Sequence, residues 1–218
     1  KVYWRGWKKG LKGVTVYRDG SRSGVLVSSD TKPNDDAFSE TPAPKRPDLL
    51  DCDIHQTSIK GEKWTILVGL MDGMPYEIMG GLSKNIELPK KYKSGILVKK
   101  PRKTMPSIYD LKISVEDDTI LLKDIVSIFD NPNYSSFTRT LSLALRHGAP
   151  IVYIVEQLQK DKDADLFSFA KVIARVLKQY IKDGTKPSKT TCDSCGSESL
   201  TYQEGCVICL SCGHGKCN

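Results

Sequence analysis

The sequence lacks the features that place a chain in a membrane or in a secretion pathway. No run of about 18 apolar residues, the length needed to span a bilayer, occurs among its 218 residues. The first five residues (KVYWR) are not a secretory signal, so we expect a cytoplasmic protein without a membrane partner. Because the sequence does not begin with Met, we also expect a fragment or a processed chain.

Catalytic signatures are missing as well. We find no glycine-rich phosphate loop, no nucleophile with a nearby base and no carboxylate pair with a telling spacing. His55 is expected on a strand and His147 at a helix end, where structural roles are commoner than catalysis. The sequence therefore predicts no catalytic and no cofactor-binding residue in this chain, which looks incomplete as a free-standing enzyme.

Composition and charge exclude other classes. With 39% hydrophobic and 27% charged residues the chain is neither disordered nor fibrous, and its length favours two folded units. The net charge of +7 is concentrated in residues 1–24 and 84–103, which leaves the remainder mildly acidic. The basic run at 99–103 could contact nucleic acid through phosphates, but such runs are more often solvated or protect a sheet edge. Nucleic-acid binding is therefore the less favoured interpretation.

Hydrophobic patterning divides the chain into five segments. Residues 1–27 begin with an amphipathic helix from Val2 to Leu11, followed by Gly13 and a strand at 14–17. Two segments are polar linkers, one of them rich in Asp, Ser and Pro. In chain order we predict a helix–strand piece, a linker, an α+β domain, a second linker and a cysteine-rich tail, at residues 1–27, 28–46, 47–184, 185–191 and 192–218.

The predicted α+β domain has its strands first and its helices after them. Residues 64–68 and 76–79 form a hairpin over the Asp72-Gly73 turn, and three further strands follow at 95–99, 109–115 and 119–122. Helices are predicted at 134–147, with Gly148 as its C-cap, at 150–160 and at 166–181. This order is typical of an antiparallel sheet covered by three helices.

The cysteines are the most informative residues. Six of the seven lie in the last 27 residues, and Cys52, which has no partner nearby in the sequence, is expected to be a small buried hydrophobic residue. Short Cys-x-x-Cys spacings in a chain without a secretion signal favour metal binding or thiol redox chemistry over a disulfide framework.

Four of these cysteines have the spacing of a zinc ribbon. Two copies of Cys-x-x-Cys-Gly carry the pairs Cys192/Cys195 and Cys209/Cys212, and tetrahedral Zn²⁺ needs four such thiolates. The 13 residues between the pairs suffice for a small hairpin. His214 could also ligate zinc, but on its glycine-flanked turn it is expected to be exposed.

Cys206 and Cys217 exceed what a zinc site needs. Extra thiols near a C-terminus can exchange with a disulfide elsewhere, so a redox relay is one interpretation. Alternatively Cys206 replaces Cys209 as a zinc ligand, or both surplus cysteines are incidental. The spacing alone leaves these alternatives open.

Three stretches resemble adenosylcobalamin-dependent (class II) ribonucleotide reductases. Residues 13–22, after a Trp/Lys-rich helix, resemble the last barrel strand and exit of their catalytic domain. The tail, with Glu204-Gly205-Cys206-x-x-Cys209-x-x-Cys212-Gly213 and a terminal Lys216-Cys217, resembles their cysteine-rich C-terminal extension. The residues between them are similar to the accessory domain that precedes this extension, through Arg46-Pro47, Lys63-Trp64, Val68-Gly69-Leu70, Pro75-Tyr76-Glu77 and Gly80.

The resemblance implies a C-terminal portion, or a separately encoded small subunit, of a ribonucleoside-diphosphate reductase that makes deoxyribonucleotides. Residues 1–27 would then be a barrel remnant. The tail would hold zinc through Cys192, Cys195, Cys209 and Cys212 and relay electrons to the active-site disulfide through Cys206 and Cys217. Adenosylcobalamin would serve the complete enzyme without binding this chain.

The partners implied are the catalytic barrel, an external thiol reductant and further copies of the complete enzyme. Within that picture residues 184–190 would form a flexible tether that lets the tail swing between two partners. The rival hypotheses are a zinc-ribbon module that binds nucleic acid through the basic segment, and a structural oligomerisation domain.

Overall fold

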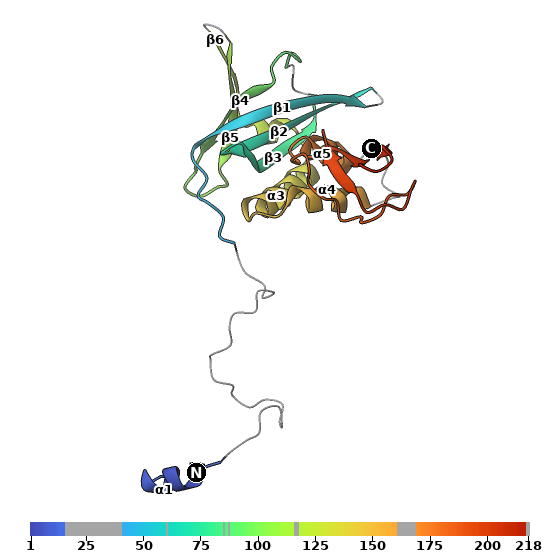
Figure 1. Cartoon of the computed structure of the whole chain (residues 1–218). Helices are drawn as coiled ribbons and strands as arrows, with labels where there is room; N and C mark the ends of the chain where they lie inside the picture. Colours follow the sequence, from blue (N-terminus) through green and yellow to red (C-terminus); the bar gives the residue numbers. More distant parts are fainter. Residues whose placement is uncertain are drawn as a thin grey trace. The chain divides into compact units, whose positions relative to one another are not determined.

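The structure is a computed structural model that describes residues 1–15, 41–59, 61–84, 86, 88–115, 118–160 and 169–216. The chain divides into two units, residues 1–39 and 40–218. The first unit contributes one helix to the described residues, and the second contains a sheet with its helices and a cysteine-rich ribbon (Figure 1).

Helix α1 (Val2–Lys8) is shorter than the predicted helix to Leu11. Its aromatic side chains are largely exposed, 58% at Trp4 and 76% at Trp7. Val14 and Thr15 are not in a strand, and the rest of the strand predicted at 14–17 lies outside the described residues. Residues 1–15 thus contain the helix of the predicted helix–strand piece but no strand, and the assignment of residues 1–27 to a barrel remnant stays a prediction.

The second unit is built on a six-stranded antiparallel sheet in the order β3-β2-β1-β4-β5-β6. The predicted hairpin is confirmed, with Asp72 and Gly73 at its turn. The three later strands are confirmed too, and β1, which the patterning left without bounds, pairs with both β2 and β4. The strands are β1 (Leu49–Ile59), β2 (Glu62–Met71), β3 (Met74–Leu82), β4 (Ser94–Lys100), β5 (Ile108–Val115) and β6 (Asp118–Leu122).

Strand β2 carries an uninterrupted buried run from Trp64 to Gly69 because both faces of the sheet are covered there. On one face Trp64, Ile66 and Val68 pack into a core shared with the helices. On the other face Leu67 joins a second core that includes Cys52. Cys52 is 1% exposed, and burial raises the pKa of its thiol well above the ordinary value, which confirms it as a buried apolar residue.

Helices α3 (Pro132–Arg146), α4 (Ile151–Lys160) and α5 (Phe169–Lys178) confirm the three predicted helices and lie beside β2 and β3 (Figure 1). Asn131 caps α3 with its side chain, and Gly148 follows its end with a φ of 76°. The short helix α2 (Ile125–Ile128) was not predicted, since four residues are too few for a periodic pattern. Among the described helices, none has the length and apolar character that a bilayer crossing requires.

A three-stranded sheet forms the ribbon at the C-terminal end, with the order β7 (Leu200–Gln203), β8 (Cys206–Cys209) and β9 (Gly215–Lys216). Residues 185–191, predicted as a linker, contain neither helix nor strand, but they are held by hydrogen bonds. The amide of Tyr202 donates to the Thr185 carbonyl, and the amide of Ser188 donates to Glu156 Oε1 at 2.8 Å. The segment is thus hydrogen-bonded to the ribbon at Thr185 and to α4 at Ser188.

Candidate metal centre

Local turns in the ribbon bring its two cysteine pairs together. Strands β7 and β8 pair in register from Leu200 with Cys209 to Gln203 with Cys206. The turn between them consists of Glu204 and Gly205, both with positive φ, which is the backbone geometry that suits a tight hairpin. The hairpin anticipated between the two Cys-x-x-Cys pairs is therefore present.

Both Cys-x-x-Cys-Gly segments fold in the same way. The amide of Gly196 donates to the Cys192 carbonyl at 3.0 Å, and the amide of Gly213 donates to the Cys209 carbonyl at 2.8 Å. Each glycine has a φ near 70° that a residue with a side chain adopts with strain. The repeated Cys-x-x-Cys-Gly spacing thus encodes two equivalent turns, each presenting two thiols.

The four thiols converge on one point. The sulfurs of Cys192, Cys195, Cys209 and Cys212 all lie within 4.8 Å of one another. The Cys192–Cys212 and Cys195–Cys209 sulfur separations are 3.8 Å and 3.7 Å. A tetrahedral zinc ion with Zn–S bonds of about 2.3 Å places its ligand sulfurs about 3.8 Å apart. The site therefore fits a metal ion such as zinc.

Backbone amides prepare the ribbon for thiolates. Donation from the Cys212 amide, assisted by that of Ser211, lowers the pKa of Cys209 to about 6. The amides of Cys195 and Ser194 lower the pKa of Cys192, the latter with its nitrogen 3.4 Å from Cys192 Sγ. At Cys195 the Ser197 amide acts in the same direction, but the adjoining thiol of Cys212 and burial outweigh it and raise the pKa to about 12. One cation shared by all four sulfurs would remove this competition.

The remaining tail residues predicted as functional lie outside the four-cysteine cluster. Cys206 begins β8, is half-buried and is disulfide-bonded, whereas the four clustered cysteines are free thiols. Cys206 therefore does not replace Cys209 in the cluster. Cys217 lies outside the described residues. His214 is exposed, as predicted, and its backbone carbonyl accepts from the Cys209 amide at 2.9 Å.

Tyr202 joins the ribbon to the sheet-and-helix core. Its side chain is 2% exposed and belongs to the same core as α5. Its carbonyl accepts from the Gly184 amide at 2.9 Å, so β7 is paired on both of its edges. At Gly205 an added Cβ would lie 3.1 Å from the Lys178 carbonyl oxygen, which shows how closely the hairpin approaches the end of α5.

The sequence did not single out this docking contact. Leu200 and Tyr202 occupy alternate positions just before the Glu204-Gly205 turn, and this spacing indicates a strand with one buried face. What the pattern could not reveal is the surface on which that face packs, because α5 precedes it by more than twenty residues.

Comparison with known proteins assigns the sheet-and-helix part of the second unit. Residues 50–182, more than half of the chain, match the family described as NrdJ homologue C-terminal domain. The chain belongs to this family. No curated protein and no solved structure matches it.

The matched range places the ribbon outside the family domain but in contact with it. The NrdJ homologue C-terminal domain ends at residue 182, ten residues before Cys192. Membership relates the chain to the class II ribonucleotide reductase family that the three resembling stretches indicated. The four-cysteine ribbon is thus an appendage of an NrdJ-related domain and packs on its last helix.

Proposed function

We propose that this chain is the C-terminal portion, or a separately encoded small subunit, of an adenosylcobalamin-dependent ribonucleoside-diphosphate reductase, and that its ribbon binds zinc and relays electrons. Membership in the NrdJ homologue C-terminal domain family supports the assignment to this enzyme. The observation that carries the relay is the division of the tail cysteines into four clustered free thiols and a disulfide-bonded Cys206 outside them.

In the proposed relay Cys206 and Cys217 form the working pair. When both are reduced, the thiolate of one attacks the active-site disulfide of the catalytic barrel and forms a mixed disulfide, releasing one active-site thiolate. The second tail thiolate then attacks the tail sulfur of that mixed disulfide, which closes the Cys206–Cys217 disulfide and releases the other active-site thiolate. The barrel cysteines gain two electrons and, at neutral pH, two protons. An external dithiol reductant then opens the tail disulfide by the same exchange.

Zinc would hold the ribbon in shape while the pair reacts. The ribbon is small, and beyond Tyr202 its own core consists of Leu200, Cys192, Cys209 and part of Val207. Such a unit depends on a metal for its fold. Four zinc-bound thiolates would also be protected from exchange, so that the relay is confined to the surplus pair.

The docking of the ribbon bears on the predicted tether. The sequence suggested residues 184–190, but Gly184, Thr185 and Ser188 are hydrogen-bonded to the ribbon or to α4. The ribbon would therefore stay docked on its domain during the relay. Tyr202→Ala, which loosens the ribbon, should then not accelerate multiple turnover. Faster turnover in Tyr202→Ala would instead favour an independently swinging ribbon.

The decisive experiment for the relay uses the complete enzyme with Cys206→Ser or Cys217→Ser. Each variant should bind zinc and reduce one equivalent of substrate, yet lose multiple turnover with a protein dithiol reductant. Cys52→Ser, which removes a cysteine from the sheet core, is the matched control and should retain turnover. Undiminished turnover in the two tail variants would refute the relay and leave the ribbon with a binding or oligomerisation role.

A further inference from the structure

The second unit contains a cavity of about 420 Å³ that is lined by residues of β3, β4, β5, α2 and α3 and of the segment between β4 and β5. This volume lies within the range of pockets that hold small organic ligands. It shares no lining residue with the four-cysteine cluster. The role proposed for the ribbon therefore does not account for it.

Cations predominate among the charged residues that line this cavity. Lys99, Arg102, Arg139 and Arg146 face a single acidic residue, Asp124. The exposed guanidinium groups are held in place by neutral partners, since Arg102 Nε donates to the Pro106 carbonyl at 2.7 Å and Arg139 donates to Ser135 Oγ at 3.1 Å. Across the described residues, neither of these arginines forms an ion pair with a carboxylate. Their positive charge remains available to an anion.

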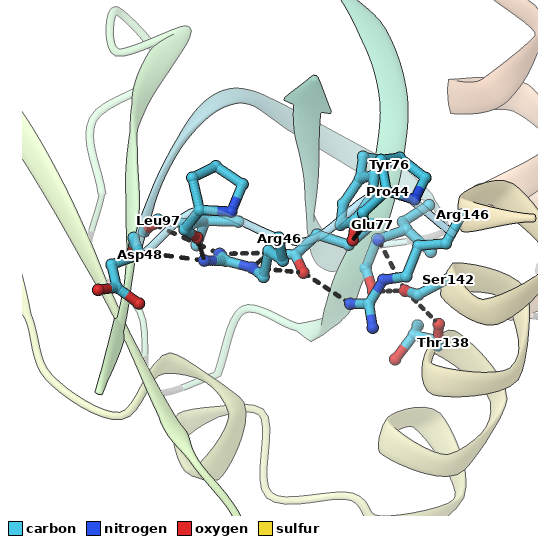
Figure 2. Close-up of polar contacts among 11 residues, drawn as sticks. Pro44, Arg46, Asp48, Tyr76, Glu77, Leu97, Thr138, Ser142 and Arg146 are labelled. Atoms are coloured by element: carbon cyan, nitrogen blue, oxygen red, sulfur yellow. Dashed lines mark hydrogen bonds and ion pairs between the residues drawn. The ribbon is translucent and has the colours of Figure 1, made fainter. Parts of the chain in front are cut away.

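Arg146, the remaining arginine of the lining, pairs with the buried carboxylate of Glu77 (Figure 2). Glu77 is fully buried and receives Arg46 through Nη2 at 2.6 Å and Arg146 through Nη2 at 2.8 Å. One carboxylate thus serves two guanidinium groups, so this cluster retains a net positive charge. Arg146 Nε is also buried, and no described residue accepts its proton. A donor in this condition is costly unless a ligand or water satisfies it.

The floor of the cavity has a different character. Its buried lining side chains include Ile78, Met79 and Phe129, together with the hydroxyl-bearing Thr138 and Ser142. The hydroxyl of Ser142 is already engaged with the backbone of Ile78, so this part of the floor offers mainly apolar surface. A ligand that fits would therefore carry a strongly anionic group at the exposed end and an uncharged, largely apolar group at the buried end.

We propose that this cavity binds a small organic phosphate, with Arg102 and Arg139 contacting the phosphate group and the floor taking the uncharged part. Planar guanidinium groups match phosphate oxygens with two parallel hydrogen bonds, and neither Arg102 nor Arg139 is paired with a carboxylate among the described residues. The limited volume selects a free small molecule over a phosphate within a polymer. The inference is independent of the ribbon, because no cysteine contributes to it.

The test is isothermal titration calorimetry of the zinc-loaded full chain with ADP, pyrophosphate and adenosine as probes. ADP should bind saturably, pyrophosphate should compete with it, and adenosine should bind far more weakly. Arg102→Gln and Arg139→Gln should each weaken ADP binding about tenfold, the effect of one charge-assisted contact. Arg175→Gln, an exposed arginine of α5 outside the cavity, is the matched control and should leave ADP binding unchanged.

A second variant separates a pocket from general electrostatic attraction. Ser107→Trp fills the cavity from a half-buried loop position while preserving every charge, and it should abolish ADP binding. Unchanged binding in Ser107→Trp, equal losses in Arg175→Gln, or no binding of ADP at millimolar concentration would each overturn the proposal. So would a single-stranded oligonucleotide that binds through Arg102 and Arg139 and is not displaced by ADP. Cys217→Ser should bind ADP normally, which keeps a failed relay distinguishable from a failed phosphate site.

Discussion

Replacement of Glu77 by Gln should destabilise the second unit more than any other single charge removal among its described residues. The carboxylate is 0% exposed and accepts from two arginines, at 2.6–3.1 Å from Arg46 and 2.8 Å from Arg146. The amide of Gln keeps the volume but leaves two guanidinium groups close together without their counter-ion. Removing one partner from a buried ion pair costs about 3–5 kcal/mol.

Variants of the two arginines should destabilise the second unit by different amounts. Arg46 is 4% exposed in its side chain and Arg146 is 28% exposed, so water can solvate Arg146 better when its partner is lost. Arg146→Gln should therefore cost less than Glu77→Gln, about 1.5–3 kcal/mol, the range for one hydrogen bond to a charged group. Arg46→Gln should fall between the two, because it also loses its donation to the Pro47 carbonyl.

Equilibrium unfolding in urea, followed by circular dichroism, measures these differences. With an m-value of about 2 kcal/mol/M, a loss of about 4 kcal/mol lowers the midpoint by about 2 M. Glu62→Gln, which neutralises an exposed carboxylate at the start of β2, is the matched control and should change stability by less than about 0.5 kcal/mol. A Glu77→Gln midpoint equal to that of Glu62→Gln would refute the reasoning, since it would mean that the buried cluster tolerates its surplus charge.

Three further predictions concern the ribbon and the sheet. The purified chain should contain one zinc ion, measured by elemental analysis, and Cys209→Ser should lose it while Cys52→Ser keeps it; retention by Cys209→Ser would exclude the four-cysteine site. Tyr202→Ala should cost about 3–5 kcal/mol in urea unfolding because an aromatic ring leaves the core, whereas Tyr202→Phe keeps the ring and should cost less than about 1.5 kcal/mol; equal effects would place the ring outside the core. Burial lowers the pKa of His55, so the unfolded chain binds its proton first and stability should fall as the pH drops below the unfolded value of about 6.5. His55→Gln should reduce this loss between pH 7 and 5.5, and an unchanged pH profile would remove His55 as its source.

The cluster of four cysteines could be predicted from the sequence because its geometry is local. A glycine after each Cys-x-x-Cys pair permits the turn that aims both thiols at one point, and the hairpin between the pairs needs only a short connection. The strands and helices of the domain were also predictable wherever apolar residues alternate with period 2 or recur with the helical period. Strand β1 and helix α2 were the exceptions, one for its mixed pattern and one for its length.

The tertiary structure decided everything that depends on residues distant in sequence. Glu77 falls in the predicted hairpin, but nothing in the sequence indicated that Arg46 and Arg146 would pair with it from 31 and 69 residues away. The linker predicted up to residue 46 is shorter at its end, because Arg46 is buried in that pair. Likewise the tail looked tethered by a free segment until Tyr202 proved to be part of the core.

The basic segment illustrates the same division. Its sequence alone favoured lysines in contact with solvent. In the structure Lys100 is half-exposed and forms an ion pair with Asp110. Arg102 instead joins Arg139 of α3 at the rim of one cavity, which only the folding of the segment beside that helix brings about. The sequence determines the charges and their spacing along the chain, whereas the packing of the sheet against the helices determines which charges meet at a shared cavity.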